Sequence, residues 1–245
     1  MEILSEVIKK LNSSKSVVFF TGAGVSAESG IPIFRGKDGI WNKLKPEELA
    51  NINAFLRNPD LVWEWYQHRR RIVEEARPNP AHLAIARMEM LLNNVIVVTQ
   101  NIDNLHKRAG SKVVYELHGN IERNYCIKCH TYYNEKLDFS DQAPRCKCGG
   151  LIRPDVVWFG EFLPEDQFAA AEKAVWECDT FVVVGTSAIV FPAASLIYTA
   201  KKNNAYIVEI NIEPTEITTL ADASIIGKAG EVLPEILAQL KKNGN

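Results

Sequence analysis

The chain lacks two features that would direct it to a membrane or to nucleic acid. No apolar run approaches the roughly 20 residues that a helix needs to cross a bilayer. There is no excess of basic residues either, because 28 lysines and arginines stand against 30 aspartates and glutamates, for a net charge of −2. The N-terminal segment MEILSEVIKKLNSSK has an amphipathic helical pattern and not that of a signal peptide. We therefore expect a cytoplasmic protein that binds neither membranes nor nucleic acid directly.

Cysteine is also scarce, and its placement is uneven. Of the five cysteines, four lie at positions 126, 129, 146 and 148, and Cys178 stands alone. In a reducing compartment this paired spacing favours a metal site over disulfides. Unligated buried thiols are the alternative, and we interpret Cys178 as a small core residue.

Short apolar, β-branched runs alternate with segments of helical period, which is typical of an α/β fold with a doubly wound parallel sheet. Strands are predicted at residues 17–20, 95–98, 113–117, 181–184 and 206–210. Helices are predicted at residues 2–12, 59–76, 80–92, 164–177, 192–203 and 231–242. Residues 36–79 and 121–152 interrupt the alternation, and we expect both to be insertions on the ligand side of the sheet.

The first predicted strand leads into a turn of small residues. The spacing GxGxxG/A, in which backbone N–H groups approach a pyrophosphate, is matched by Gly22, Gly24 and Ala27. A hydride-transfer enzyme would place an acidic residue about twenty positions later, after a second strand. Here residues 30–36 form a loop rich in Gly and Pro instead. Phe34 and Arg35 in this loop are candidates for covering a cofactor, although Phe34 could pack under its own loop and Arg35 could be solvated.

Polar residues follow the next predicted strands, at the carboxyl ends where a parallel sheet binds its ligands. Gln100, Asn101 and Asp103 follow the second strand, and such groups can recognise a carboxamide. Asn101 and Asp103 could equally cap the helix after them. His118 follows the third strand as a candidate general base, since its ordinary pKa of about 6.5 leaves it mostly neutral. A structural histidine is the alternative.

Two more strand ends could hold the second half of a dinucleotide. The residues concerned are Gly185, Thr186, Ser187, Asn211, Ile212 and Glu213. Glu213 could be the ribose-binding acid that is missing after the first strand. A turn before Pro214 is the alternative interpretation.

In their order along the chain these motifs resemble those of the sirtuins, the NAD-dependent protein-lysine deacylases. The matching blocks are GAGVSAESGIP, FRG, TQNID, RAG, LHG, the paired cysteines, VVWFGE, VGTS and GKAGEV. The resemblance covers nearly the whole chain and implies a Rossmann-like domain with a small domain made of a zinc module and a helical module. It implies Rossmann-like parts at residues 1–35, 80–120 and 153–245, a helical module at 36–79 and a zinc module at 121–152.

The resemblance implies an enzyme that consumes NAD and transfers the acyl group of a lysine to ADP-ribose, yielding nicotinamide, O-acyl-ADP-ribose and free lysine. It gives His118 the role of the base that activates a ribose hydroxyl, and Asn101 and Asp103 the role of positioning ribose and nicotinamide. Its partners would be acyl-lysine proteins or peptides bound in extended form, and we expect a monomer. The implied NAD-contacting residues are Gly22, Ala23, Gly24, Ser26, Ala27, Phe34, Arg35, Gln100, Asn101, Ile102, Asp103, His118, Gly185, Thr186, Ser187, Asn211, Ile212, Glu213 and Ala229.

The paired cysteines resemble the family's tetrahedral Zn²⁺ site, formed here by Cys126, Cys129, Cys146 and Cys148. Four thiolates leave no open position for water, so this zinc would be structural. The second pair departs from the family pattern, because it reads CxC where the family usually has CxxC. Gly149 and Gly150 could supply the backbone freedom for a tighter turn, and His130 is an alternative ligand.

Tyr66 and Arg69 form a YxxR pattern that resembles the sirtuin subclass acting on acidic acyl groups. Three residues apart on a predicted helix, they share one face, where a phenol and a guanidinium would hold a succinyl or malonyl carboxylate. The alternative is a core tyrosine beside a solvated arginine. The family's substrate-binding stretch, which pairs with an extended peptide, is matched by Val157, Trp158, Phe159 and Gly160, and residues 188–193 resemble its opposite side.

Other functions stay open at this point. An NAD-dependent oxidoreductase would explain the glycine turn, but not the missing acidic residue. An ADP-ribosyl transferase would use the same co-substrate, and a non-catalytic module would use the zinc insertion to recruit partners. A zinc hydrolase is disfavoured, because a Cys₄ site offers no position for water.

Overall fold

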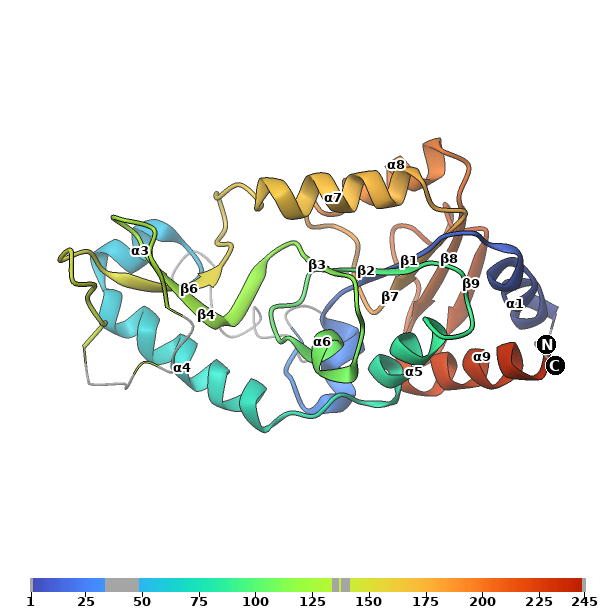
Figure 1. The fold of residues 1–245 in the computed structure, drawn as a ribbon, viewed down its shortest axis with the longest axis horizontal. Helices are drawn as coiled ribbons and strands as arrows, with labels where there is room; N and C mark the ends of the chain where they lie inside the picture. The colour runs from blue at the N-terminus through green and yellow to red at the C-terminus, as the bar shows by residue number, and fades with distance from the viewer. Residues whose placement is uncertain (1, 34–48, 134–136, 138–141, 244–245) are drawn as a thin grey trace.

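The computed structural model describes residues 2–33, 49–133, 137 and 142–243 (Figure 1). Its larger part is a six-stranded sheet in the order β3-β2-β1-β7-β8-β9, and every pair of neighbours is parallel. The strands are β1 (Val17–Thr21), β2 (Val95–Thr99), β3 (Val114–Glu116), β7 (Thr180–Val184), β8 (Tyr206–Asn211) and β9 (Ala223–Ile226). Since β1 lies in the middle, the turn that follows it opens at the centre of the sheet edge.

Helices cover both faces of this sheet, as Figure 1 shows. Side chains alternate along β1, so Val17 and Phe19 enter one apolar core while Val18 and Phe20 enter the other. The first core is covered by α1 (Glu2–Ser13), α5 (Pro80–Met88) and α9 (Ala229–Asn243). The second is covered by α7 (Glu165–Trp176) and α8 (Ser195–Lys202). The predicted doubly wound α/β fold is therefore confirmed.

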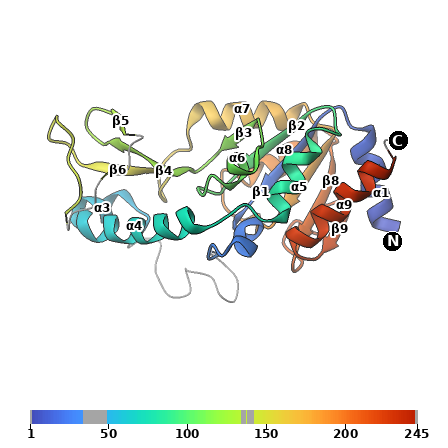
Figure 2. The same cartoon turned by 60° about the horizontal axis from the view of Figure 1, so that its bottom comes forward.

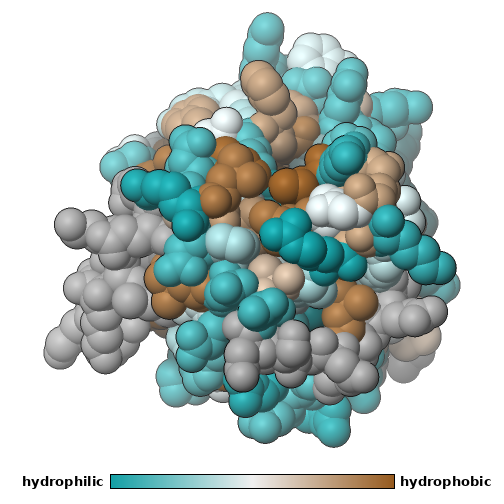
Figure 3. Space-filling view, turned by 90° about the vertical axis from the view of Figure 1, so that its left-hand side faces the viewer, coloured by the Kyte–Doolittle hydropathy of each residue, from teal (hydrophilic) through white to brown (hydrophobic). Residues whose placement is uncertain are grey.

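A second region extends from the β3 end of the sheet (Figure 2). It contains α3 (Ile52–Arg57), α4 (Pro59–Glu75) and an antiparallel sheet in the order β5-β4-β6. The strands are β4 (Gly119–Cys126), β5 (Tyr132–Tyr133) and β6 (Ile152–Val156). A third apolar cluster, which includes Phe55, Trp63 and Trp158, lies between these helices and strands. On the face of this region seen in Figure 3, hydrophobic side chains are scattered among hydrophilic ones.

Several elements differ from the sequence-based expectations. Strand β9 was not predicted, and α8 begins at Ser195 instead of residue 192. The predicted helix at residues 80–92 ends at Met88. The segment expected to have little periodic structure contributes most of β4 and all of β5. Among the described helices, none combines the length and apolarity needed to cross a membrane.

Candidate active site

A cavity of about 870 Å³ opens at the carboxyl ends of the parallel strands and reaches the second region. Two short helices begin beside it, η1 (Ala23–Ser29) after β1 and α6 (Leu105–Ala109) after β2. Residues from the ends of β1, β2, β7 and β8 line one side, and residues 156–161 line another. The site therefore lies where a doubly wound sheet binds its ligands.

The floor of the cavity is made by two glycine turns in direct backbone contact. Gly22 N donates to Val184 O (3.0 Å) and Gly24 N donates to Gly185 O (2.8 Å). A Cβ at Gly24 would lie 2.8 Å from Gly185 Cα, and a Cβ at Gly185 would lie 2.5 Å from Val25 N. Gly185 also has φ +59°, which favours glycine. Such a bare backbone cradle fits the pyrophosphate of a dinucleotide.

Polar side chains tie the neighbouring strand ends together. Gln100 Nε2 donates to Thr186 Oγ1 (3.0 Å), which joins the chain after β2 to the chain after β7. Asn211 Nδ2 donates to Thr186 O (3.0 Å), which adds the end of β8. These bonds fix three segments that the sequence predicted to contact NAD, and all three line the same cavity.

His118 lies in the cavity wall with a defined tautomer. Its Nδ1 is 2.8 Å from Gln100 O, and since a carbonyl only accepts, Nδ1 carries the proton. In the neutral ring Nε2 is then unprotonated and able to take a proton. Burial is the main influence on the pKa of His118 and lowers it, while the bond to Gln100 O acts in the opposite direction. The imidazole is therefore neutral near pH 7, as a general base must be.

Behind the cavity wall, a chain of buried hydrogen bonds holds Asn101. Asn79 N donates to His82 Nδ1 (3.3 Å), so His82 Nε2 carries the proton, 3.3 Å from Ser26 Oγ. Ser26 Oγ donates to Asp103 Oδ2 (2.7 Å) and accepts from Asn101 Nδ2 (3.1 Å). Burial lowers the pKa of His82 to about 4, so the His82 imidazole in this chain of hydrogen bonds is neutral near pH 7.

The side-chain amide of Asn101 presents one particular atom to a ligand. Its Nδ2 also donates to Gly22 O (3.0 Å), which together with the Ser26 bond occupies both amide protons. The amide oxygen is the group left to accept from a ligand hydroxyl.

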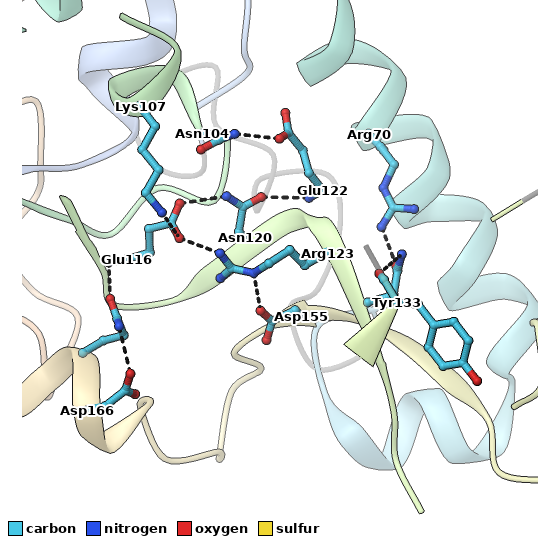
Figure 4. A network of polar contacts seen from close by, with 12 residues as sticks. Arg70, Asn104, Lys107, Glu116, Asn120, Glu122, Arg123, Tyr133, Asp155 and Asp166 are labelled. Carbon is cyan, nitrogen blue, oxygen red and sulfur yellow. Dashed lines mark hydrogen bonds and ion pairs between the residues drawn. The ribbon is translucent and has the colours of Figure 1, made fainter. Parts of the chain in front are cut away.

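A charged network braces the strand connection that carries His118 (Figure 4). Glu116, only 4% exposed, is 2.8 Å from Lys107 Nζ and 2.9 Å from Arg123 Nη1. Arg123 Nε also donates to Asp155 Oδ2 (2.8 Å), and Asn120 Nδ2 donates to Glu116 Oε1 (2.7 Å). The network links β3 and α6 to β4 and β6, and so fixes the two regions against each other around His118.

The part of the cavity formed by α4 contains the Tyr66 and Arg69 pair predicted to read the acyl group. Tyr66 is buried on α4, and the Arg69 guanidinium carbon is 5.7 Å from the centre of its ring and 4.8 Å from that of Trp65. Both Tyr66 and Arg69 line the cavity.

The four paired cysteines come together at one end of the second region. Their sulfur atoms all lie within 4.8 Å of one another, with Cys126 and Cys148 Sγ 3.5 Å apart. Tetrahedral Zn–S bonds of about 2.3 Å require sulfurs about 3.8 Å apart, so the donor set and spacing fit a structural zinc. Gly149 has φ +81°, and a Cβ at Gly150 would lie 2.7 Å from Cys126 Sγ. Both glycines thus permit the tight CxC turn, while His130 is not part of the group.

Most residues predicted for the site line this one cavity. Ser26 and Asp103 instead lie behind the lining, where they hold Asn101, and Phe34 and Arg35 lie outside the described residues. The lining also includes residues that the sequence analysis did not name. Ile33, Ala50, Leu163, Thr215 and Glu216 lie in none of the matching blocks, whereas Glu28 and Lys228 lie within the blocks GAGVSAESGIP and GKAGEV. Ala50, for example, is drawn in because its carbonyl accepts from Phe159 N (2.9 Å).

The model of the Sir2 family matches residues 22–192. The NAD-dependent protein deacylase of Pyrococcus furiosus is 51% identical over 98% of this chain and 99% of its own length. That of Aquifex aeolicus is 50% identical over 93% of this chain and 96% of its own length. The chain therefore belongs to the Sir2 family, which confirms the resemblance to the sirtuins and the prediction of an enzyme.

Solved structures of the family agree with the fold. A Sir2 homologue in complex with NAD has a TM-score of 0.93 and 46% identity, over 98% of this chain and 95% of that one. Sir2Af2 bound to a myristoylated histone peptide has a TM-score of 0.79 and 39% identity, over 99% of this chain and 98% of that one.

Proposed function

We propose that this protein is an NAD-dependent protein-lysine deacylase that removes succinyl and malonyl groups as well as acetyl groups. Its products would be nicotinamide, O-acyl-ADP-ribose and free lysine. The relatives named NAD-dependent protein deacylases, which match nearly the full chain, support the general activity. The acidic acyl groups are our inference from residues of this chain.

One observation carries the proposal: a single cavity is lined by His118, Asn101, Tyr66 and Arg69. A base, a ribose-positioning amide and two donors suited to a carboxylate therefore share one solvent-accessible space. An oxidoreductase would have no need of a phenol and a guanidinium in the same cavity as the glycine turns.

The hydrogen bonds of Asn101 and His118 support a separate role for each of them in the reaction. NAD, when bound over the glycine turns, supplies a ribose carbon from which nicotinamide can be displaced. The oxygen of the Asn101 side chain accepts from a ribose hydroxyl, since its amide protons are already bonded. His118 Nε2 takes the proton from a hydroxyl that must become a nucleophile, while Gln100 O holds the ring in place.

Residues 157–160 are suited to bind an extended peptide. Val157 N donates to His118 O (3.0 Å) and Phe159 N donates to Ala50 O (2.9 Å), so this stretch is anchored beside the base. Pairing through the main chain would accept many sequences around the modified lysine.

The test is to mix the protein with NAD and with acetyl-, succinyl- or malonyl-lysine peptides. We expect nicotinamide and unmodified peptide to appear in equal amounts. Absorbance of reduced nicotinamide would support an oxidoreductase instead. ADP-ribose attached to the peptide would support an ADP-ribosyl transferase.

The acyl preference is tested by Arg69→Met. Loss of the guanidinium should lower kcat/KM for the succinyl peptide about ten- to hundredfold, because a carboxylate loses a charge-assisted donor. The acetyl peptide should change little. Arg71→Met is the matched control, since Arg71 is an exposed arginine on the same helix. Equal losses for both peptides in Arg69→Met would contradict the assignment.

A further inference from the structure

The hydroxyl of Tyr66 is bonded to the indole of Trp158, a residue 92 positions away in the chain. Trp158 Nε1 lies 2.8 Å from Tyr66 Oη. Both side chains are 1% exposed, yet both line the cavity. This bond links the proposed acyl-reading helix α4 directly to the proposed peptide-binding stretch.

The bond can run in only one direction. An indole N–H donates and has no acceptor, so Tyr66 Oη must be the acceptor. The proton of the Tyr66 hydroxyl is therefore turned away from Trp158. Among the described residues, the hydroxyl makes no second hydrogen bond. Burial raises the pKa of Tyr66, so the hydroxyl keeps this proton over the working pH range.

Trp158 is itself held firmly. The Arg153 guanidinium carbon lies 3.4 Å from the centre of the indole, and Phe55 packs at 5.2 Å from it. The backbone N of Trp158 donates to Glu161 Oε2 (2.8 Å), and the same carboxylate is paired with Arg153. The indole N–H thus has a fixed position and direction.

Tyr66 is held from its other sides by residues of its own helix. The ring of Trp65 meets it edge to face, with centroids 4.7 Å apart and planes at 82°. Arg69, one turn further along α4, places its cation 5.7 Å from the Tyr66 ring. The free phenol proton and this cation therefore belong to one part of the cavity.

We propose that Trp158 is a specificity-determining residue that acts through Tyr66: by donating to the phenol oxygen, it commits the Tyr66 hydroxyl to donate in turn to the carboxylate of an acidic acyl group. An acetyl group has no carboxylate to accept this bond. The inference rests on the proposed succinyl and malonyl activity and explains how the phenol is set to recognise these groups.

The experiment compares kcat/KM for succinyl- and acetyl-lysine peptides in the wild type, Trp158→Phe, Tyr66→Phe and the double variant. Phenylalanine keeps an aromatic ring against Arg153 and removes the N–H donor together with part of the indole volume. We expect Trp158→Phe to lower the succinyl value about five- to tenfold more than the acetyl value. In the double variant, the succinyl loss should equal that of Tyr66→Phe alone. Trp158 acts through the Tyr66 hydroxyl, and Tyr66→Phe has already removed that hydroxyl.

A matched control separates specificity from packing. Trp63 is also buried on α4, and its Nε1 donates to Ile152 O (2.7 Å), but it does not line the cavity. Trp63→Phe removes an equivalent indole bond and should leave the ratio of succinyl to acetyl activity unchanged.

A second measurement does not depend on how well Trp158→Phe folds. The indole N–H of Trp158 in the ¹⁵N-labelled wild type should shift in the NMR spectrum when Tyr66 is changed to Phe, and also when succinyl-lysine peptide binds. Acetyl-lysine peptide should shift it much less.

Several results would overturn the inference. These are equal losses for both peptides in Trp158→Phe, no loss at all, additive losses in the double variant, or an indole resonance insensitive to Tyr66→Phe. A wild type that hydrolyses acetyl but not succinyl peptide would reject the proposed acidic acyl activity, and the inference with it. The wild-type ratio thus distinguishes the two failures.

Discussion

The two regions of the molecule are held together by different physical means. The six-stranded sheet lies between two cores made almost entirely of aliphatic and aromatic side chains. The core of the second region contains two of the paired cysteines and borders two buried arginines, Arg70 and Arg153, which are 5% and 2% exposed. Both arginines are stacked on tryptophan rings, Arg70 5.7 Å from Trp63 and Arg153 3.4 Å from Trp158.

This contrast teaches where each region is vulnerable. Apolar burial is not directional, so a large core tolerates small changes of shape. The smaller region depends on directional bonds and on thiolates, and removal of one partner leaves another buried and unsatisfied. The proposed catalytic base His118 lies between the two, bonded to Gln100 on one side and to Val157 on the other.

Removal of zinc should have the largest effect and should separate the behaviour of the two regions most clearly. Structural zinc sites contribute apparent binding free energies on the order of 10 kcal/mol, so a strong chelator should unfold the three-stranded sheet. Hydrogen exchange should then speed up at residues 124–133 and 146–152 but stay slow in β1, β7 and β8. Deacylase activity should be lost as well, because the Val157 contact depends on β6. Uniform loss of protection would show that the two regions do not unfold separately.

A smaller effect is expected from Arg153→Met. Breaking the pair with Glu161 should lower the free energy of unfolding by about 3 kcal/mol, measured by urea denaturation. The double variant Arg153→Met with Glu161→Gln should recover part of this loss, since no unpaired carboxylate then remains. Ile207→Val, in the large apolar core, should cost only about 1 kcal/mol. Equal costs for Arg153→Met and Ile207→Val would remove the contrast between the cores.

On the fold itself the smallest effect is expected from pH, which acts on the activity. Burial lowers the pKa of His118 below 6.5, and the base must be neutral, so activity should be present at pH 6.5 and fall as the pH drops through the lowered pKa. Below that pKa, kcat/KM should fall about tenfold for each pH unit. An acetyl peptide should be used, because a succinyl carboxylate titrates too. An acidic limb centred above pH 7 would contradict the assignment, and His118→Ala should abolish the limb along with most of the activity.

The sequence was most informative where burial is continuous. Strands β1, β2, β7 and β8 were placed within about a residue of their observed ends, since parallel strands buried on both faces form uninterrupted apolar runs. Spacing indicated the glycine turn and the paired cysteines, and the positions after apolar runs indicated the polar strand ends, whereas the full set of site residues came from the resemblance to the sirtuins. Strand β9 was missed because it is not buried on both faces. Ser224 and Ile225 are half-buried and Ile226 is exposed, so the sequence here has no continuous apolar run like those of the central strands.

What the sequence could not provide were contacts between distant residues. Strand β6 contains Arg153, Pro154 and Asp155, which are all polar or strand-breaking by type. Arg153 can be buried because it stacks on Trp158 and pairs with Glu161. The bond between Trp158 and Tyr66 likewise depends on tertiary packing. Ser26 was expected in the lining of the cavity. It lies behind the lining instead, where its hydroxyl donates to Asp103 and accepts from Asn101.

The backbone contact between Gly24 and Gly185 has a consequence for how this pocket can change. Each turn occupies the space that a methyl group on the other would need, so the base of the cavity has one fixed depth. A larger or smaller ligand therefore has to be accommodated by changes in the side walls of the cavity, such as residues 156–161 or 212–216. Engineering for larger acyl groups should therefore begin at those walls and leave both glycines unchanged.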